Sequence, residues 1–267
     1  MKTTGEIERR KAAFADLVEI IDTLRVACPW DKKQTLESLR SLTVEEVYEL
    51  GDAVACGDLQ EVKKELGDLI MHVVFYARIG EETGAFDIAG VLEGICEKLR
   101  YRHPHVYGAV QVANEHDVSR NWEQLKLKEK GRASVLGGVP SALPAMIKAY
   151  RVQDKARGVG FDWKRPGDVW EKVHEELREL QEELERDDKE RVEEELGDFL
   201  FAVINAARLH DINPENALEK ANRKFIRRFN HIEERARASG RPLTELSLEE
   251  METLWQEAKT KEREETT

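Results

Sequence analysis

The chain contains few of the residues that stabilise small extracellular domains or form membrane segments. Its 267 residues include three cysteines, Cys28, Cys56 and Cys96, an odd number without the spacing of a metal site. We therefore expect reduced, buried thiols in a cytoplasmic protein. No run approaches the roughly 18 apolar residues of a membrane span. The polar N-terminal stretch MKTTGEIERRKAAF lacks the apolar core of a signal peptide.

An excess of positive charge is also missing. The chain carries 42 lysines and arginines against 54 aspartates and glutamates, which gives a net charge of -12. This net negative charge excludes a protein that binds nucleic-acid polymers through its overall charge. A smaller polyanionic ligand would need a local basic patch or a bound cation.

Charged and aliphatic residues are abundant, and they recur at helical spacing. Hydrophobic residues make up 40% of the chain, charged residues 36% and aromatic residues 7%, which is typical of long amphipathic helices. Apolar spacing, capping residues and glycine or proline breaks predict an all-α fold with no strong strand. The predicted helices are 5–27, 36–55, 59–82, 88–102, 114–130, 142–157, 168–186, 189–210, 214–238 and 247–263.

Two clusters of acidic residues share one internal spacing. The first is Glu46, Glu49, Glu65 and Asp68, and the second, 130 residues later, is Glu176, Glu179, Glu195 and Asp198. The steps within each cluster are 3, 16 and 3 residues. This repeat predicts two copies of one helical unit. Three glycines and a proline at 131–140 indicate the boundary, with domains at 1–131 and 141–267 and a linker at 132–140.

The spacing predicts a metal site on an antiparallel helix pair in each copy. Residues three or four apart lie on one helix face, and a short turn joins the two helices of each pair. Four carboxylates then face one another, which is repulsive unless a cation binds. Carboxylate oxygens suit Mg²⁺ or Mn²⁺ better than zinc.

A solvated acidic face is the alternative, because glutamate is common on helix surfaces. Two features favour the metal site. The runs that follow Asp68 and Asp198 are apolar on nearly every side, so we expect these helices to be buried. A buried carboxylate is rare unless it is paired or bound to a metal. The recurrence of the whole spacing is the second feature.

Several stretches resemble a known family. The EExxE pattern, the 16-residue step, and the stretches CPWD, YRHPHVYG, ELGD and KFIRRF are similar to the all-α nucleoside triphosphate pyrophosphohydrolases. The two-copy length resembles the MazG family, and the resemblance covers nearly the whole chain. It implies Mg²⁺-dependent cleavage of a nucleoside triphosphate to a monophosphate and pyrophosphate, in house-cleaning or nucleotide-pool regulation. It also implies a homodimer with intertwined helices.

The resemblance assigns roles to individual residues. It implies that Glu176, Glu179, Glu195 and Asp198 hold Mg²⁺ and that Glu46, Glu49, Glu65 and Asp68 match them. Glu175, or Glu45 in the first copy, is a spare carboxylate that could orient or deprotonate a water molecule. The implied nucleotide-binding residues are Lys172, Glu175, Arg191, Glu194, Lys224, Arg227, Arg228 and Trp255. Each role has a plain structural alternative. The basic residues Lys224, Arg227 and Arg228 could belong to an ordinary amphipathic helix, Trp255 could be a core residue, and Glu175 could face solvent or cap a helix.

Two other functions fit parts of the sequence. Glu171 and His174 offer one Glu-x-x-His motif of a di-metal oxidase, but the first copy has Ser41 and Val44 there. A regulatory helical scaffold that binds a protein partner and keeps one vestigial metal site is the other alternative.

The basic segments predict that the second copy carries most of the activity. Lys224, Arg227 and Arg228 lie within five residues, on a helix that can bind phosphates. In the first copy Pro104 ends the corresponding helix and separates its charges. The first-copy residues in that region are Lys98, Arg100, Arg102 and His103.

Overall fold

The computed structural model describes residues 3–112, 114, 118, 121, 122, 125, 134–163, 165 and 167–265. In these ranges the regular structure is helical and contains no strand, which confirms the all-α fold. The predicted helix at 114–130 lies almost wholly outside the described residues. The chain divides into two compact units, Met1–Val112 and Ala113–Thr267. This division falls inside the predicted N-terminal domain, and the linker at 132–140 stays a prediction.

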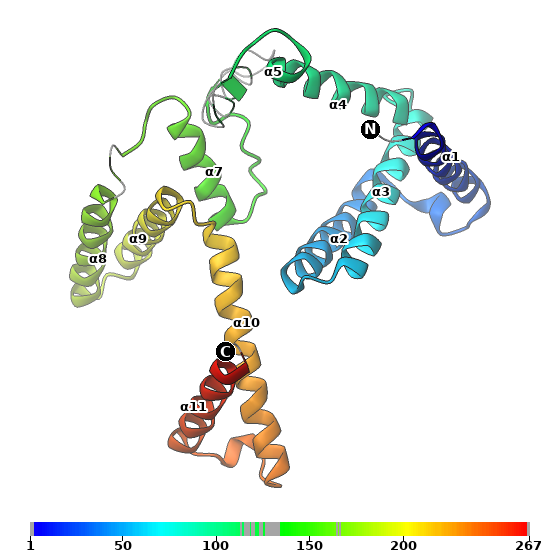
Figure 1. Ribbon diagram of the computed structural model, residues 1–267. Helices are drawn as coiled ribbons and strands as arrows, with labels where there is room; N and C mark the ends of the chain where they lie inside the picture. Colours follow the sequence, from blue (N-terminus) through cyan, green and yellow to red (C-terminus); the bar gives the residue numbers. More distant parts are fainter. Residues whose placement is uncertain are drawn as a thin grey trace. The chain divides into compact units, whose positions relative to one another are not determined.

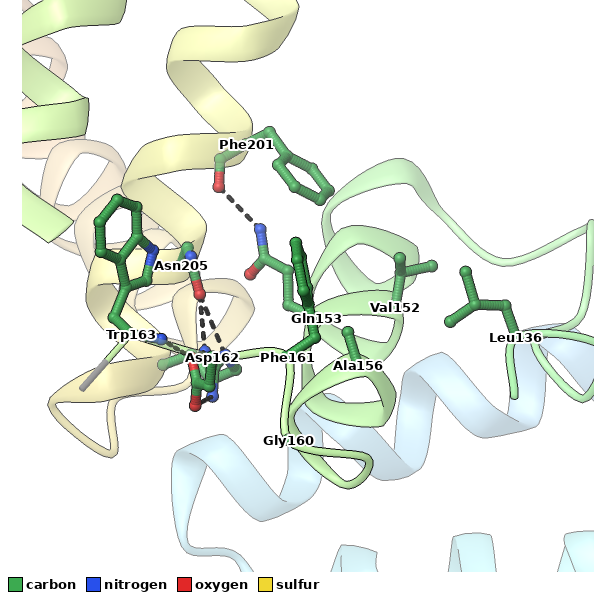
Figure 2. A pocket seen from close by; sticks show the side chains of 11 residues that line it. Leu136, Val152, Gln153, Ala156, Gly160, Phe161, Asp162, Trp163, Phe201 and Asn205 are labelled. Atoms are coloured by element: carbon green, nitrogen blue, oxygen red, sulfur yellow. Dashed lines mark hydrogen bonds and ion pairs between the residues drawn. The ribbon is translucent and has the colours of Figure 1, made fainter. Parts of the chain in front are cut away.

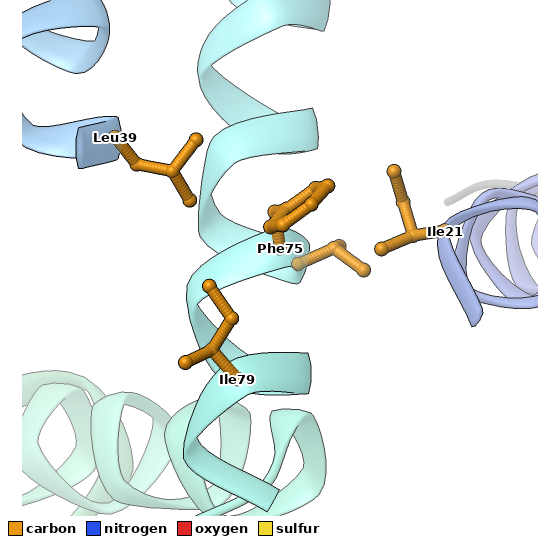
Figure 3. Close-up of a cluster of buried hydrophobic side chains, with 5 residues drawn as sticks. Ile21, Leu39, Phe75 and Ile79 are labelled. Atoms are coloured by element: carbon orange, nitrogen blue, oxygen red, sulfur yellow. The ribbon is translucent and has the colours of Figure 1, made fainter. Parts of the chain in front are cut away.

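The first unit is built around an antiparallel helix pair. Its helices are α1 (Thr4–Ala27), α2 (Leu36–Cys56), α3 (Leu59–Glu82), α4 (Ile88–Arg102) and α5 (Pro104–Tyr107), with a short 3₁₀ turn, η1 (Asp31–Lys33). The α2 and α3 helices lie side by side, and α1 packs on α3 (Figure 1). Their shared core consists of Ile21, Leu39, Val74, Phe75 and Ile79 (Figure 3). The predicted bounds of the four long helices are correct to within about one residue because capping residues and proline act locally.

The second unit repeats this pair and adds a hairpin. Its helices are α7 (Ala145–Arg157), α8 (Asp168–Arg186), α9 (Lys189–Leu209), α10 (Pro214–Ala238) and α11 (Leu248–Glu265), with a 3₁₀ turn, η2 (Leu243–Glu245). The α8 and α9 helices pair, α7 packs on α9, and α10 packs against α11. Val169, Val173, Ala202 and Ala206 form the buried cluster between α8 and α9.

The turn within each helix pair is built in the same way. Gly57, after α2, has a φ of 72°, and Asp187, 130 residues later, has a φ of 56° after α8. The next residue, Asp58 or Asp188, accepts a hydrogen bond from a backbone N–H in the first turn of the following helix. These equal turns hold both pairs in one register, so the acids occupy equivalent positions.

Both central helices expose an apolar stripe. Its residues are Leu66, Ile70 and Val73 in α3 and the equivalent Leu196, Leu200 and Val203 in α9. The expectation that these helices are buried on every side is therefore wrong for a single chain. The neighbouring helices of each unit cover only part of the circumference of α3 and of α9.

Two of the three cysteines are exposed. Cys56 ends α2, and Cys96 lies on α4, a helix with no buried residue. The expectation of buried thiols is wrong for these two, because their positions on α2 and α4 leave them exposed. None of the described helices has the length and the apolar character that crossing a membrane requires.

Candidate active site

The first helix pair brings three of the predicted acids together. One carboxylate oxygen each from Glu46, Glu49 and Glu65 lies within 4.8 Å of the others. Glu65 is 2% exposed, and its Oε1 accepts a hydrogen bond from Lys64 Nζ at 2.9 Å. Its Oε2 is buried and has no hydrogen-bond partner among the described residues. A buried oxygen without a donor destabilises the fold, so this position favours a bound cation.

Repulsion within the first cluster alters its titration. Burial raises the pKa of Glu46, and the charges of Asp68 and Glu49 raise it further. Lys64 holds the pKa of Glu65 below its usual value. Asp68 therefore acts on the cluster through its charge, although it is not one of the three acids whose oxygens converge. Lys64 alone does not neutralise the negative charge of this cluster.

The second helix pair brings its acids together in two overlapping groups. Oxygens of Glu176, Glu195 and Asp198 lie within 4.8 Å of one another, and so do oxygens of Glu175, Glu176 and Glu179. Glu176 belongs to both groups and is 6% exposed. The other three predicted acids, Glu179, Glu195 and Asp198, thus lie around the buried carboxylate of Glu176, with Glu175 beside them.

Lys172 already contributes a positive charge to the second cluster. Its Nζ lies 2.6 Å from Glu175 Oε1 and 2.7 Å from Glu176 Oε1. Hydrogen bonds to these two carboxylates raise the pKa of Lys172, so the amine stays protonated. Partial burial and the charge of Glu179 nevertheless raise the pKa of Glu195. The ammonium group of Lys172 therefore does not neutralise the charge of the whole cluster.

The donor atoms of both clusters fit a hard divalent cation. They are carboxylate oxygens, whereas a zinc site would use thiolate or imidazole ligands. The orphaned Oε2 of Glu65 and the raised pKa values of Glu46 and Glu195 each indicate missing positive charge. The oxidase alternative does not fit, because His174 Nδ1 lies 2.6 Å from the carbonyl oxygen of Trp170 and is in neither acid group of the described second unit.

The basic residues expected at the nucleotide lie mainly on α10, next to α11. Arg228 donates to Glu262 at 2.8 Å, and its guanidinium lies 5.4 Å from the ring centroid of Trp255. Arg227 is 3.4 Å from the same carboxylate, and Lys224 is exposed. The structure thus brings Arg228 to Trp255, and it brings Arg227 and Arg228 to the carboxylate of Glu262. The contacts it shows for them lie within this hairpin rather than at the acids of α8 and α9.

Arg191 and Glu194 occupy the start of α9. They form an exposed ion pair with a separation of 2.9 Å. They lie one turn before Glu195 and Asp198, so they share a helix with two of the predicted metal ligands.

A partly buried polar network behind the first cluster was not predicted. Thr43 Oγ1 donates to the carbonyl oxygen of Leu39 and lies 2.8 Å from His72 Nδ1 and 2.9 Å from Tyr76 Oη. The second copy has apolar residues at the three equivalent positions, Val173, Ala202 and Ala206. The residues that pack behind the two acid clusters therefore differ, since they are polar in the first unit and apolar in the second. The histidine within an otherwise apolar run was the signal in the sequence.

Comparison with known proteins decides the family. The profile described as the MazG nucleotide pyrophosphohydrolase domain matches residues 34–107 and 167–233. The chain belongs to the MazG family. Each matched segment contains one acid cluster, which confirms the two repeated units.

Relatives of the MazG family match most of this chain. The nucleoside triphosphate pyrophosphohydrolase of Escherichia coli K12 is 42% identical, over 88% of this chain and 91% of its own length. The nucleoside triphosphate pyrophosphohydrolase/pyrophosphatase MazG of Thermotoga maritima is 43% identical, over 92% of this chain and 95% of its own. The Bacillus subtilis protein YabN is 47% identical over 94% of this chain, which corresponds to 52% of YabN.

Proposed function

We propose that this protein hydrolyses nucleoside triphosphates to nucleoside monophosphate and pyrophosphate, with the help of a divalent metal ion. The observation that carries the proposal is the convergence of carboxylates around the buried Glu176, on a helix pair of the MazG domain. A water molecule adds across the bond between the α and β phosphates, so the α phosphate stays on the nucleoside.

The acids of the second copy would hold Mg²⁺, or Mn²⁺ in its place. These ligands are Glu176, Glu179, Glu195 and Asp198, with Glu46, Glu49, Glu65 and Asp68 as their counterparts. A bound ion of this kind supplies positive charge to phosphate oxygens and lowers the pKa of a water molecule. The charge of such an ion would offset the burial and the neighbouring carboxylates that raise the pKa of Glu195 in the protein without metal.

Glu175 is the proposed group that orients or deprotonates the attacking water. Its carboxylate lies beside the metal cluster, yet its side chain is 47% exposed. The ammonium of Lys172 holds one of its oxygens at 2.6 Å. The second oxygen is then the one that can accept a proton from water. Glu45 is its counterpart in the first copy.

Further residues are proposed to bind the triphosphate and nucleoside. They are Lys172, Arg191, Glu194, Lys224, Arg227, Arg228 and Trp255. Arginine binds phosphate through two parallel hydrogen bonds. Arg227 and Arg228 share the Glu262 carboxylate. A bound phosphate would take the place of this carboxylate as the anion that the two arginines contact.

A second copy of the chain is the proposed partner. The stripe of Leu196, Leu200 and Val203 is exposed in a single chain and recurs at the same positions of α3. A continuous apolar stripe of this kind is typical of an interface. Light scattering after size-exclusion chromatography should give twice the monomer mass, and Leu200→Glu should reduce it to the monomer mass.

A product analysis tests the function. The purified protein is incubated with a panel of nucleoside triphosphates and Mg²⁺, and pyrophosphate is measured separately from orthophosphate. We expect pyrophosphate in a 1:1 ratio to the monophosphate, and no turnover with a chelator. Orthophosphate and a nucleoside diphosphate would overturn the α–β assignment. A folded protein that binds Mg²⁺ without turnover would instead support the regulatory scaffold.

A further inference from the structure

A cavity of about 570 Å³ lies in the second unit, between α7, α9 and the loop 158–163 (Figure 2). Its walls are largely apolar or aromatic, and include Leu136, Val152, Ala156, Phe161, Trp163 and Phe201. Phe161 is 82% exposed and Trp163 is 41% exposed. None of its lining residues has a proposed role at the metal or the phosphates.

Gln153 adds an unpaired acceptor to this cavity. The side chain is 6% exposed, and its Nε2 donates to the carbonyl oxygen of Phe201 at 2.8 Å. Its Oε1 is buried and has no hydrogen-bond partner within the described part of the chain. The amide cannot turn round, because Oε1 would then face a carbonyl oxygen. A ligand that donates a hydrogen bond would remove the cost of this unpaired atom.

Asn205 can supply the complementary donor. Its Oδ1 accepts hydrogen bonds from Arg208 at 2.8 and 3.2 Å, so its Nδ2 is the group that can donate into the cavity. Arg208 is itself buried and pairs with Asp162 at 3.0 Å. This pair neutralises the arginine and fixes the orientation of Asn205. Gln153 of α7 and Asn205 of α9 line the same cavity, so their acceptor and donor can match the alternating donors and acceptors along the edge of a nucleobase.

The first copy has a buried aromatic side chain at the position equivalent to Asn205. The position 130 residues before Asn205 is Phe75, which is 3% exposed in the core of the first unit (Figure 3). A polar residue at a core position loses apolar burial. The exchange of phenylalanine for asparagine therefore favours a ligand site over packing.

The cavity begins beside the second acid cluster. Asp198, Phe201 and Asn205 follow one another at steps of three and four residues, so they share one face of α9. At about 1.5 Å per residue, the cavity lies about 5 to 10 Å along the helix from Asp198. The ribose and α phosphate of a nucleotide can bridge such a separation.

We propose that this cavity holds the nucleobase of the substrate. The base lies against the rings of Phe161 and Trp163 and uses its edge to bind Gln153 Oε1 and Asn205 Nδ2. The inference rests on the proposed function, since it takes the phosphates to lie at the acid cluster.

The test compares a ligand that has a base with one that lacks it. Phe161→Ser removes an exposed ring, Gln153→Met removes the acceptor, and Asn205→Phe installs the first-copy residue. Val159→Ser is the matched control, because Val159 is 50% exposed in the same loop but does not line the cavity. The measured quantities are the KM for nucleoside triphosphates and the inhibition constant of Mg²⁺-tripolyphosphate.

We expect Phe161→Ser to raise KM roughly 10-fold, in line with the usual strength of base stacking on aromatic rings. Gln153→Met and Asn205→Phe should raise KM by a similar factor, because each removes a hydrogen bond to the base. The inhibition constant of tripolyphosphate should stay unchanged, and Val159→Ser should match the wild type in both. An unchanged KM in Phe161→Ser and Gln153→Met would overturn the base site. An equal rise in KM and in the inhibition constant of tripolyphosphate would also overturn the base site.

The base site and the proposed function fail separately. If the wild type released no pyrophosphate, the proposed function would be wrong. Dissociation constants for the triphosphate and tripolyphosphate, measured by calorimetry in the same variants, would still decide whether the cavity binds the base.

Discussion

The ammonium of Lys172 lies 2.7 Å from the carboxylate of Glu176, at the buried centre of the second acid cluster. Lys64 makes the same kind of contact with Glu65 in the first cluster, at 2.9 Å. The two lysines come from different helices of their pairs, α8 and α3. In both copies, a lysine therefore lies at the most buried acid, where a metal ion would also place its charge.

Replacing Lys172 with methionine should tighten Mg²⁺ binding several-fold when no nucleotide is present. The variant keeps the aliphatic stem and removes the cation that competes for Glu175 and Glu176. Isothermal titration calorimetry measures the effect. Lys189→Met, at an exposed position of α9, makes the same change in net charge away from these contacts. Weaker binding in Lys172→Met, or equal gains in both variants, would contradict the competition.

The two copies should contribute unequally to turnover. Glu179→Gln should lower kcat by at least about 100-fold, since even indirect partners of metal ligands contribute 10- to 100-fold. Glu49→Gln, at the equivalent position, should retain most of the activity, because the basic helix and the cavity described above belong to the second unit. Pyrophosphate release at saturating Mg²⁺ is the measurement. The opposite result would show that the first copy carries the activity.

The stability of the metal-free protein should depend on the protonation of Glu195. Its pKa is raised above the usual 4.5 in the folded state, so the folded protein binds this proton more tightly than the unfolded chain does. The stabilisation is complete below pH 4.5 and is lost as the pH rises through the raised pKa.

Thermal unfolding with a chelator, over a pH series, tests this effect. Glu195→Gln should remove the part of the stability loss at rising pH that this carboxylate causes. Glu190→Gln, at an exposed position of the same helix, should behave like the wild type. Saturating Mg²⁺ should restore the wild-type stability at neutral pH. A Glu195→Gln variant with an unchanged pH profile would show that the carboxylate titrates normally.

Asp187→Gly should stabilise the second helix pair by up to about 1 kcal/mol. Asp187 has a φ of 56°, in the left-handed region where a side chain is strained and glycine is not. The equivalent Gly57 has a φ of 72°, so Gly57→Asp should destabilise the first pair by a similar amount. Melting temperatures of the two variants form a matched comparison. A lower melting temperature for Asp187→Gly would mean that the aspartate side chain stabilises the turn.

Local features of the sequence determined the helices and the repeat. Asp58 and Asp188 cap their helices through backbone groups three residues away or fewer, so their effect can be read from a short stretch. The spacing of Glu46 and Glu49, or of Glu176 and Glu179, also fixes which acids share a face. These relationships need no knowledge of the rest of the chain.

Only the tertiary structure decided burial and convergence. Glu65 and Glu176 became the buried acids, and Gln153 met the backbone of Phe201, because helices distant in the sequence pack there. Phe75 and Asn205 occupy equivalent positions, yet one fills a core and the other lines a cavity. Periodicity shows which face of a helix is apolar, but how much of that face is covered depends on its neighbours. For this reason the exposed stripes on α3 and α9 could not be predicted from their apolar sequence.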